Sequence, residues 1–289
     1  MRLAVTGDLN AGVFDALLHH CQPCIQGQDQ QLALDLSGAE WGSPSGLVPL
    51  ASLIRTLKSR DVVVSVDAYP DESVCGYYCR MNFFETIGAD SPCRDAKRQS
   101  GEGRFIEITE LRLPQIEAEN RTKLTGLLQR LPKGVEATEV SRNSFIDACG
   151  EVVSNTRHAY NGAVDANVAN LSPALIQAQF YPRLGKVEFC VCDAGLGIKR
   201  SMEGEHRDYF GTHLAAITAA LAYRNQGPME DGAGLGLAAL ESYVKKNGGV
   251  LRIRSGDALR VQRGSRGASS TQELPSWDGT IVTVEGRAT

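Results

Sequence analysis

The chain has 289 residues, of which 42% are hydrophobic, and this length and composition predict two domains with ordinary globular cores. Its 30 basic and 34 acidic side chains give a formal net charge of −4, which excludes a strongly basic nucleic-acid-binding tail and any general attraction to anionic membranes. No apolar run approaches the roughly 18 residues of a transmembrane helix, and the first residues lack the pattern of a signal peptide. We therefore expect a cytoplasmic protein without a membrane segment.

The first domain, residues 1–90, is expected to alternate strands and helices. Apolar and β-branched residues predict strands at 31–36 and 61–66, and apolar residues at helical spacing predict helices at 47–57 and 75–87. This alternation is typical of a layer of parallel strands covered by helices.

Residues 91–103 are expected to form an exposed linker. They contain Ser91-Pro92, a mixed run of charges and Gly101-Glu102-Gly103, with few apolar side chains. The second domain is then predicted to span residues 104–289.

In this second domain the patterns predict strands mixed with helices, so that the chain as a whole belongs to the α/β (α+β) class. The expected strands are residues 104–108, 186–193, 250–254 and 280–284. The expected helices are residues 113–131, 144–159, 212–224 and 237–246. Residues 256–279 are polar and rich in Gly and Ser, which predicts a long hairpin loop.

The eight cysteines are expected to be thiols, because cytosolic chains rarely keep disulfides. Cys21-Gln-Pro-Cys24 has the spacing of a metal or redox pair, but its nearest candidate partners, Cys75 and Cys79, are one residue too far apart for a common zinc knuckle. Structural thiols are therefore preferred to zinc ligands at these positions.

The first of three chemical motifs is Glu151-Val-Val-Ser-Asn155-Thr-Arg-His158, in a predicted helix. Glu151 and Asn155 are four residues apart and therefore share a helix face. A carboxylate beside a carboxamide offers the hard oxygen ligands that suit Mg²⁺ and its waters. A solvated helix face would look the same, and for this motif alone that plainer interpretation is favoured.

The second motif is Asp193-Ala-Gly195-Leu-Gly197-Ile, which follows a predicted strand directly. A carboxylate at the end of a strand can accept a hydrogen bond from an exocyclic amine, and the glycines let the backbone turn sharply and approach a flat base. The alternative is a strand-to-helix turn in which Asp193 caps the helix.

The third motif, Gly232-Ala-Gly234-Leu-Gly236-Leu, opens the predicted helix at 237–246. Backbone amides at a helix N-terminus bind phosphate through unpaired N–H groups and the positive end of the helix dipole. The glycine spacing differs from the dinucleotide fingerprint, and the Gly-Lys-Ser/Thr of a P-loop is missing. The alternative is a flexible glycine hinge.

In this order the three motifs resemble the N, G1 and G2 boxes of the GHKL ATPases, the superfamily with the Bergerat fold that includes histidine kinases. Gly248-Gly249-Val250-Leu251-Arg252-Ile253-Arg254-Ser255, followed later by Gly279-Thr280-Ile281-Val282, looks like the final strands and the Gly-Thr step of that superfamily. The resemblance covers about residues 104–286. It implies an α/β sandwich that binds ATP and Mg²⁺.

The resemblance also implies a role for each matching residue. Asn155 matches the Mg²⁺ ligand, Glu151 matches the carboxylate that positions or activates water in hydrolysing members, and Asp193 matches the aspartate that reads adenine. The other nucleotide-binding positions that it implies are His158, Gly195, Gly197, Gly232, Gly234, Gly236 and Thr280.

Residues 199–231 correspond to the lid that closes over the nucleotide in the superfamily. His158 lies at the end of the N box, where a basic residue can meet phosphate. A half-buried helix histidine is nearly as well supported by the sequence at this position.

Within residues 1–90, Leu32-Ala33-Leu34-Asp35-Leu36-Ser37-Gly38 and then Ser43-Pro44-Ser45-Gly46-Leu47 resemble STAS domains, the anti-anti-sigma fold. That family has a phosphorylated serine in an Asp-Ser-Ser-Gly-Leu stretch. Here Pro44 aligns most simply with that serine, and Ser45 with its neighbour. The alternative is an ordinary α/β domain with a Ser/Gly turn.

The first functional hypothesis is an ATP-using signalling enzyme, either a slow ATPase switch or a serine kinase of the anti-sigma type, acting on a protein partner. None of the five histidines lies in a pattern that resembles a phosphoacceptor hairpin, so autophosphorylation on histidine is not expected. The second hypothesis is a non-catalytic module in which ATP orders the lid and so gates a partner surface.

A third hypothesis is an ATPase linked to nucleic acid, because five arginines cluster near the C-terminal hairpin. They are not interleaved with aromatic residues, which is more typical of a solvated loop, so nucleic acid is not the expected partner. The arginines concerned are Arg252, Arg254, Arg260, Arg263 and Arg266.

The superfamily often forms homodimers, and the sequence leaves a homodimer open.

Overall fold

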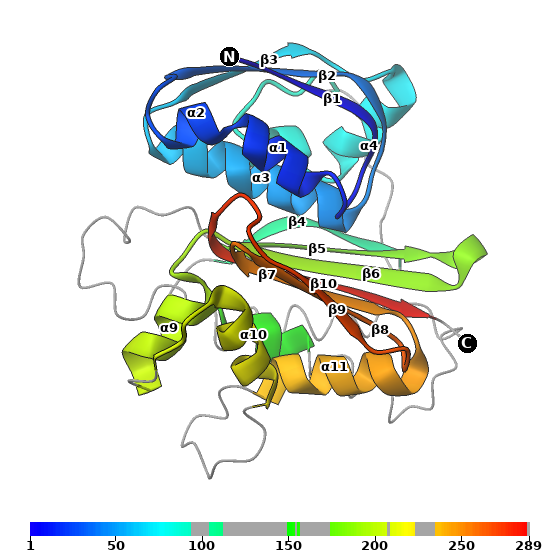
Figure 1. Ribbon diagram of the computed structural model, residues 1–289. Helices are drawn as coiled ribbons and strands as arrows, with labels where there is room; N and C mark the ends of the chain where they lie inside the picture. The colour runs from blue at the N-terminus through cyan, green and yellow to red at the C-terminus, as the bar shows by residue number, and fades with distance from the viewer. Residues whose placement is uncertain are drawn as a thin grey trace.

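The computed structural model describes residues 1–93, 104–111, 149–153, 155–156, 174–206, 209–222 and 235–287. The described chain forms four layers (Figure 1): a three-stranded sheet, a layer of helices, a seven-stranded sheet and a second layer of helices. The protein is thus of the mixed α/β class that the sequence predicted, and its larger sheet is antiparallel. None of the helices in the described ranges is long and apolar enough to cross a membrane.

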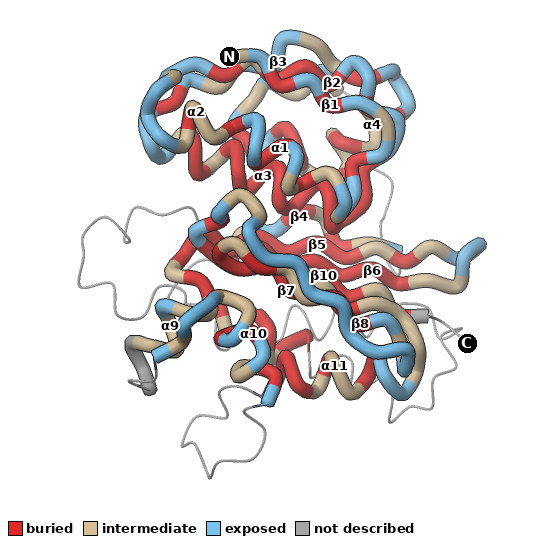
Figure 2. Tube along the Cα trace, viewed as in Figure 1, coloured by how far each residue is buried: buried red, intermediate tan, exposed pale blue. Residues whose placement is uncertain are grey.

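The small sheet consists of β1 (Arg2–Leu9), β2 (Gln31–Gly42) and β3 (Val63–Ala68), which run parallel in that order. The predicted parallel layer is therefore confirmed, although β1 was not predicted. One face of the sheet carries the helices and the other is exposed (Figure 2), which agrees with the alternating burial along β1. The helices of this segment are α1 (Phe14–His20), α2 (Gln22–Ile25), α3 (Pro44–Ser59), α4 (Glu72–Arg80) and α5 (Phe83–Thr86).

The single helix predicted at 75–87 is wrong, because the chain forms α4 and α5 there. The carboxylate of Asp71 accepts hydrogen bonds from the backbone N–H groups of Ser73 and Val74 and so begins α4 earlier than predicted. Asn82, with a φ of 60°, adopts the left-handed conformation and separates the two helices.

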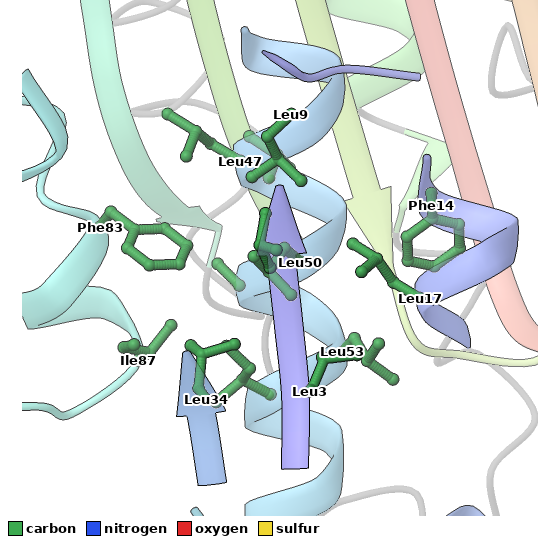
Figure 3. Close-up of a cluster of buried hydrophobic side chains, with 14 of the residues drawn as sticks. Leu3, Leu9, Phe14, Leu17, Leu34, Leu47, Leu50, Leu53, Phe83 and Ile87 are labelled. Atoms are coloured by element: carbon green, nitrogen blue, oxygen red, sulfur yellow. The ribbon is translucent and has the colours of Figure 1, made fainter. Parts of the chain in front are cut away.

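Helix α3 lies between the two sheets and is buried on almost every side. A helix with apolar residues on most of its surface needs cover on several sides, and here each sheet supplies one side. Figure 3 shows its leucines Leu47, Leu50 and Leu53 beside Leu3 of β1 and Leu34 of β2. The first segment therefore builds its core around this one helix.

The large sheet is antiparallel, in the order β4-β5-β6-β10-β7-β8-β9. Its strands are β4 (Phe105–Leu111), β5 (Ala174–Tyr181), β6 (Lys186–Asp193), β7 (Val250–Gly256), β8 (Ala258–Arg263), β9 (Ala268–Thr271) and β10 (Trp277–Arg287). The long loop predicted at 256–279 is wrong, because β8, β9 and the start of β10 occupy much of it. The sequence of β9 is polar because this strand is at the edge of the sheet and every residue in it is exposed.

Helices α9 (Gly197–His206), α10 (His213–Ala222) and α11 (Leu235–Asn247) cover one face of the large sheet (Figure 1). Residues 149–153 are also helical, within the predicted 144–159, whereas the predicted helix at 113–131 lies outside the described residues. Val191 of β6 packs in the core with Leu240 of α11, while the adjacent Cys192 packs in the core that contains α3. Both faces of this sheet are therefore covered.

The apolar core around α3 extends into the second segment, because Leu175 of β5 and Ile281 of β10 belong to it. An ion pair and an aromatic contact join the same parts: Arg254 Nε donates to Asp15 Oδ1 at 2.8 Å, and the ring of Phe14 lies edge-on to that of Trp277 with 5.5 Å between centroids. The predicted boundaries at residues 90 and 104 thus lie between segments that share one core.

Ser45 is buried where α3 meets β6. Its hydroxyl lies 2.9 Å from that of Ser43, and its backbone N–H donates to Glu188 Oε1 at 3.0 Å. The Glu188 carboxylate is itself buried and pairs with Lys186 at 3.2 Å. A negative group on Ser45 would therefore enter a buried site that already holds one carboxylate.

We expect Ser45→Asp to destabilise the protein by about 3–5 kcal/mol, the cost of an uncompensated buried charge. Ser45→Ala removes only one hydrogen bond and should cost about 1 kcal/mol. Urea unfolding at pH 7 compares the two variants with the unchanged chain. Equal unfolding midpoints for Ser45→Asp and Ser45→Ala would contradict this account.

Candidate functional site

Three polar residues form a row across neighbouring strands of the large sheet. Asp193, the last residue of β6, lies opposite Thr280 of β10, and Thr280 lies opposite Ser255 of β7. Directly opposed residues in antiparallel strands present their side chains on the same face. Val191 and Val282, two positions away on β6 and β10, pack in the core beneath α11, so the row faces the layer of α9, α10 and α11.

Asp193 is 4% exposed, and its carboxyl group is fixed by the backbone. Its Oδ1 accepts hydrogen bonds from the N–H of Gly195 at 3.0 Å and of Thr280 at 3.3 Å. Among the described residues, no hydrogen bond reaches Oδ2. Burial raises the pKa of Asp193 to about 7. The two hydrogen bonds from backbone N–H groups lower this pKa, but their effect is smaller than that of burial. Near neutral pH the group can thus offer one oxygen to a donor on a ligand.

The turn after Asp193 requires glycine at position 197. Gly197 has a φ of 72°, and a Cβ there would lie 2.9 Å from Ser255 Oγ. Ser255 Oγ accepts from the N–H of Ile198 at 3.0 Å and donates to the carbonyl of Gly279 at 2.9 Å. The predicted G1 turn is therefore tied to β7 and to the residue before Thr280.

Gly279 brings the start of β10 very close to the end of β6. A Cβ at Gly279 would lie 2.1 Å from the carbonyl oxygen of Asp193, so no other residue fits without movement of the backbone. Trp277 Nε1 donates to the same carbonyl oxygen at 3.0 Å. The main chain of Asp193 is thus held in place by Gly279 and Trp277 of the neighbouring segment.

The first and third motifs also meet in the structure. Gly236 lies in the first turn of α11, and a Cβ there would lie 2.6 Å from the Cβ of Glu151 and 3.0 Å from the backbone nitrogen of Val152. Val152 packs in the same core as Leu237 of α11. Asn155, also half-buried, continues the segment that carries Glu151. Glycine at 236 is what allows the two segments this close approach.

Part of the predicted site lies outside the described residues, namely His158, Gly232 and Gly234. The described parts of the predicted lid at 199–231 include α9 and α10. Ala216 and Ile217 of α10 are fully buried, and Ile217 packs in the core of the large sheet. This section of the predicted lid is therefore part of the second helical layer.

The sequence analysis gave no role in the site to Ser255 or Trp277, which contact the turn and the main chain of Asp193. Ser255 is the next-to-last residue of β7, a strand that was predicted to stop at residue 254, and its role depends on its position opposite Thr280. Trp277 was assigned to the expected loop. Only the pairing register of β10 with β6 and β7 could have pointed to either residue.

No protein-family model matches the sequence, and no curated protein matches it either. The chemistry of the site is therefore judged from its own residues. They offer a buried carboxylate with one oxygen held by the backbone and a hydroxyl on the opposite strand. They also offer a second carboxylate, that of Glu151, in a segment packed against the start of α11, with the carboxamide of Asn155 four residues further along the chain.

Proposed function

We propose that the protein is an ATP-binding signalling protein with a GHKL-type domain of Bergerat fold in residues 104–289 and a STAS-like domain in residues 1–90. It acts on a protein partner as a Mg²⁺- and ATP-dependent switch, as an ATPase or as a serine kinase. The order of the three motifs supports this proposal, together with a sheet that carries α9, α10 and α11 on the face to which Asp193 points.

The observation that carries the proposal is the environment of Asp193. Its Oδ1 is occupied by two backbone N–H groups, which leaves Oδ2 as an acceptor for the exocyclic amine of adenine. The side chain of Thr280 lies on the same face of the sheet, directly opposite on the neighbouring strand. A buried acceptor at a strand end beside a hydroxyl suits a base that both donates and accepts hydrogen bonds.

The other end of the nucleotide would meet the first turn of α11 and the segment that carries Glu151 and Asn155. The N-terminus of this 13-residue helix favours anionic phosphate. The Asn155 side chain supplies a hard oxygen for Mg²⁺, and Glu151 would orient the water or hydroxyl that attacks. ATP supplies the phosphoryl group that is transferred. The Gly236 contact keeps these two groups of residues adjacent.

The alternative is a gated interaction module that binds ATP without useful turnover. Helix α9 follows the Gly197 turn directly, so a ligand at Asp193 could change the position of this helix. This alternative predicts nucleotide binding with no release or transfer of phosphate.

The test uses the purified chain, Mg²⁺ and ATP labelled on the γ-phosphate. We expect the unchanged chain to release or transfer the labelled phosphate. In Asn155→Ala the rate of this step should fall by about a hundredfold or more, since the variant loses an oxygen that stabilises developing charge through Mg²⁺. Asn10→Ala, which changes an exposed amide in the loop after β1, is the matched control and should keep the full rate.

The destination of the label separates the hypotheses. Free phosphate identifies an ATPase, and labelled protein, its own or a partner's, identifies a kinase. ATP that binds while its label stays in place favours the gated module. Failure to bind ATP would contradict the proposal as a whole, because the ATPase, the kinase and the gated module all require bound ATP.

A further inference from the structure

Three thiols lie close together beside α4, at positions far along the sequence from the residues of the candidate functional site. The Sγ atoms of Cys75, Cys79 and Cys93 all lie within 4.8 Å of one another, and those of Cys75 and Cys93 are 3.9 Å apart. Cys75 is buried and the other two are half-buried. This cluster includes Cys93, which the comparison of Cys75 and Cys79 with a zinc knuckle did not consider.

The fold assembles the cluster from two pieces of chain. Cys75 and Cys79 are four residues apart on α4 and therefore share a face of the helix. The segment after α5 returns to that face, because Tyr69 Oη donates to the carbonyl of Asp90 at 3.1 Å and Ser91 Oγ donates to Cys79 Sγ at 3.4 Å. Cys93 is thereby the third thiol of the cluster, and its distance along the sequence from Cys79 matches no common metal-binding motif.

We propose that Cys75, Cys79 and Cys93 form a binding site for a zinc ion, with three thiolates from the chain and a fourth position taken by water. Thiolates select soft or borderline ions such as Zn²⁺, and a zinc site with three protein ligands keeps its fourth position open. Tetrahedral coordination at the usual Zn–S distance places sulfur atoms about 3.8 Å apart. The 3.9 Å between Cys75 and Cys93 matches this value and is far from the ~2.05 Å of a disulfide.

The position of the site gives zinc a structural consequence. Helix α4 also carries Tyr77, whose hydroxyl donates to Gln179 of β5, and Arg80, which pairs with Glu107 of β4 at 2.6 Å. An ion that holds α4 to the segment after α5 would therefore fix the helix that contacts these two strands. The site uses no group of the proposed nucleotide site, so the inference does not depend on ATP binding.

The experiment titrates the full reduced, metal-free chain with Zn²⁺ in competition with a coloured chelator. We expect one zinc per chain and a rise in the thermal unfolding temperature, because an ion that binds only the folded state stabilises it. Co²⁺ in place of Zn²⁺ should give the absorption of thiolate-to-metal charge transfer. Cys79→Ser and Cys93→Ser should each lower zinc affinity by more than the roughly 10–100-fold that loss of a group merely supporting a ligand costs.

Cys24→Ala is the matched control, since Cys24 is also a cysteine of the first segment but lies outside the cluster. It should bind zinc as the unchanged chain does. Circular dichroism of the metal-free proteins checks that each variant folds, and the two half-buried positions provide independent variants. The inference is overturned if the reduced chain binds no zinc, or if both serine variants keep the affinity of the unchanged chain. It is equally overturned if Cys24→Ala loses zinc as they do.

Discussion

Asp193→Asn is expected to abolish ATP binding and at the same time to stabilise the protein above pH 7. The Asn oxygen can take the place of Oδ1 and accept from the N–H groups of Gly195 and Thr280. The Asn nitrogen then replaces Oδ2 and presents a donor to the adenine amine, which is also a donor. Such a mismatch of buried polar groups lowers affinity by about 10⁴-fold or more.

The effect on stability follows from the raised pKa. Asp193 titrates near 7 in the folded chain and near its ordinary value of 3.8 when unfolded. The folded state thus holds an extra proton between these values, and stability falls as the pH rises from about 4 to about 7. The loss amounts to at most about 4 kcal/mol. Asn at this position does not titrate, so the variant escapes this loss and exceeds the unchanged chain in stability at pH 8.

The two effects are measured separately, by isothermal titration with Mg²⁺ and ATP at pH 8 and by thermal unfolding at pH 5 and pH 8. Asp67→Asn, at an exposed carboxylate on β3, should change neither. Unaltered ATP affinity in Asp193→Asn would refute the role of this residue in the site. A variant no more stable than the unchanged chain at pH 8 would refute the buried, titrating carboxylate.

Gly236→Ala is expected to lower both the unfolding temperature and ATP affinity. The new methyl group would lie 2.6 Å from the Cβ of Glu151, so α11 and the segment with Glu151 must move apart. Such overpacking costs about 1–3 kcal/mol, which corresponds to a fall of several degrees at about 2–4 °C per kcal/mol. Because the separated groups are those proposed for phosphate and Mg²⁺, we expect ATP affinity to fall at least about tenfold.

Gly76→Ala is the matched control, because Gly76 also lies in a helix and a Cβ there meets nothing within 4 Å. It should leave ATP binding unchanged and raise stability by up to about 1 kcal/mol through helix propensity. Differential scanning calorimetry and ATP titration compare the two variants. If both alanine variants have the same unfolding temperature and the same ATP affinity, the close approach at Gly236 contributes neither to stability nor to ATP binding.

The sequence predicts most accurately the strands whose pattern is simple. Strand β6 has the bounds predicted for it, since its apolar residues Val187 and Phe189–Cys192, interrupted by Glu188 alone, are typical of a strand covered on both faces. Strand β5 was missed because Gln177 and Gln179 interrupt its apolar pattern, although Gln177 is fully buried in the structure. Strand β9 was missed because an exposed edge strand needs no apolar face.

The candidate site divides in the same way. Asp193 and the glycines at 195 and 197 form a local motif, so their positions in one turn could be predicted from the sequence. The place of Ser255 opposite Thr280 depends on the register between strands, and the approach of Gly236 to Glu151 depends on how two helical segments pack. Neither kind of information is contained in the spacing of residues along the chain.

The ion pair between Arg254 and Asp15 joins residues 239 positions apart. During synthesis at about 5–20 residues per second, Asp15 therefore exists for about 10–50 s before its partner has been made. For the first part of that interval, the surface of α3 that faces the large sheet also lacks β5 and β6, the strands of that sheet with which it is chiefly in contact. Contacts this remote in sequence also slow folding. The newly made chain thus has a period in which its first helices are open to aggregation or to a chaperone. The cover of α3 forms once β5 and β6 have been made, whereas Asp15 of α1 waits for Arg254 of β7.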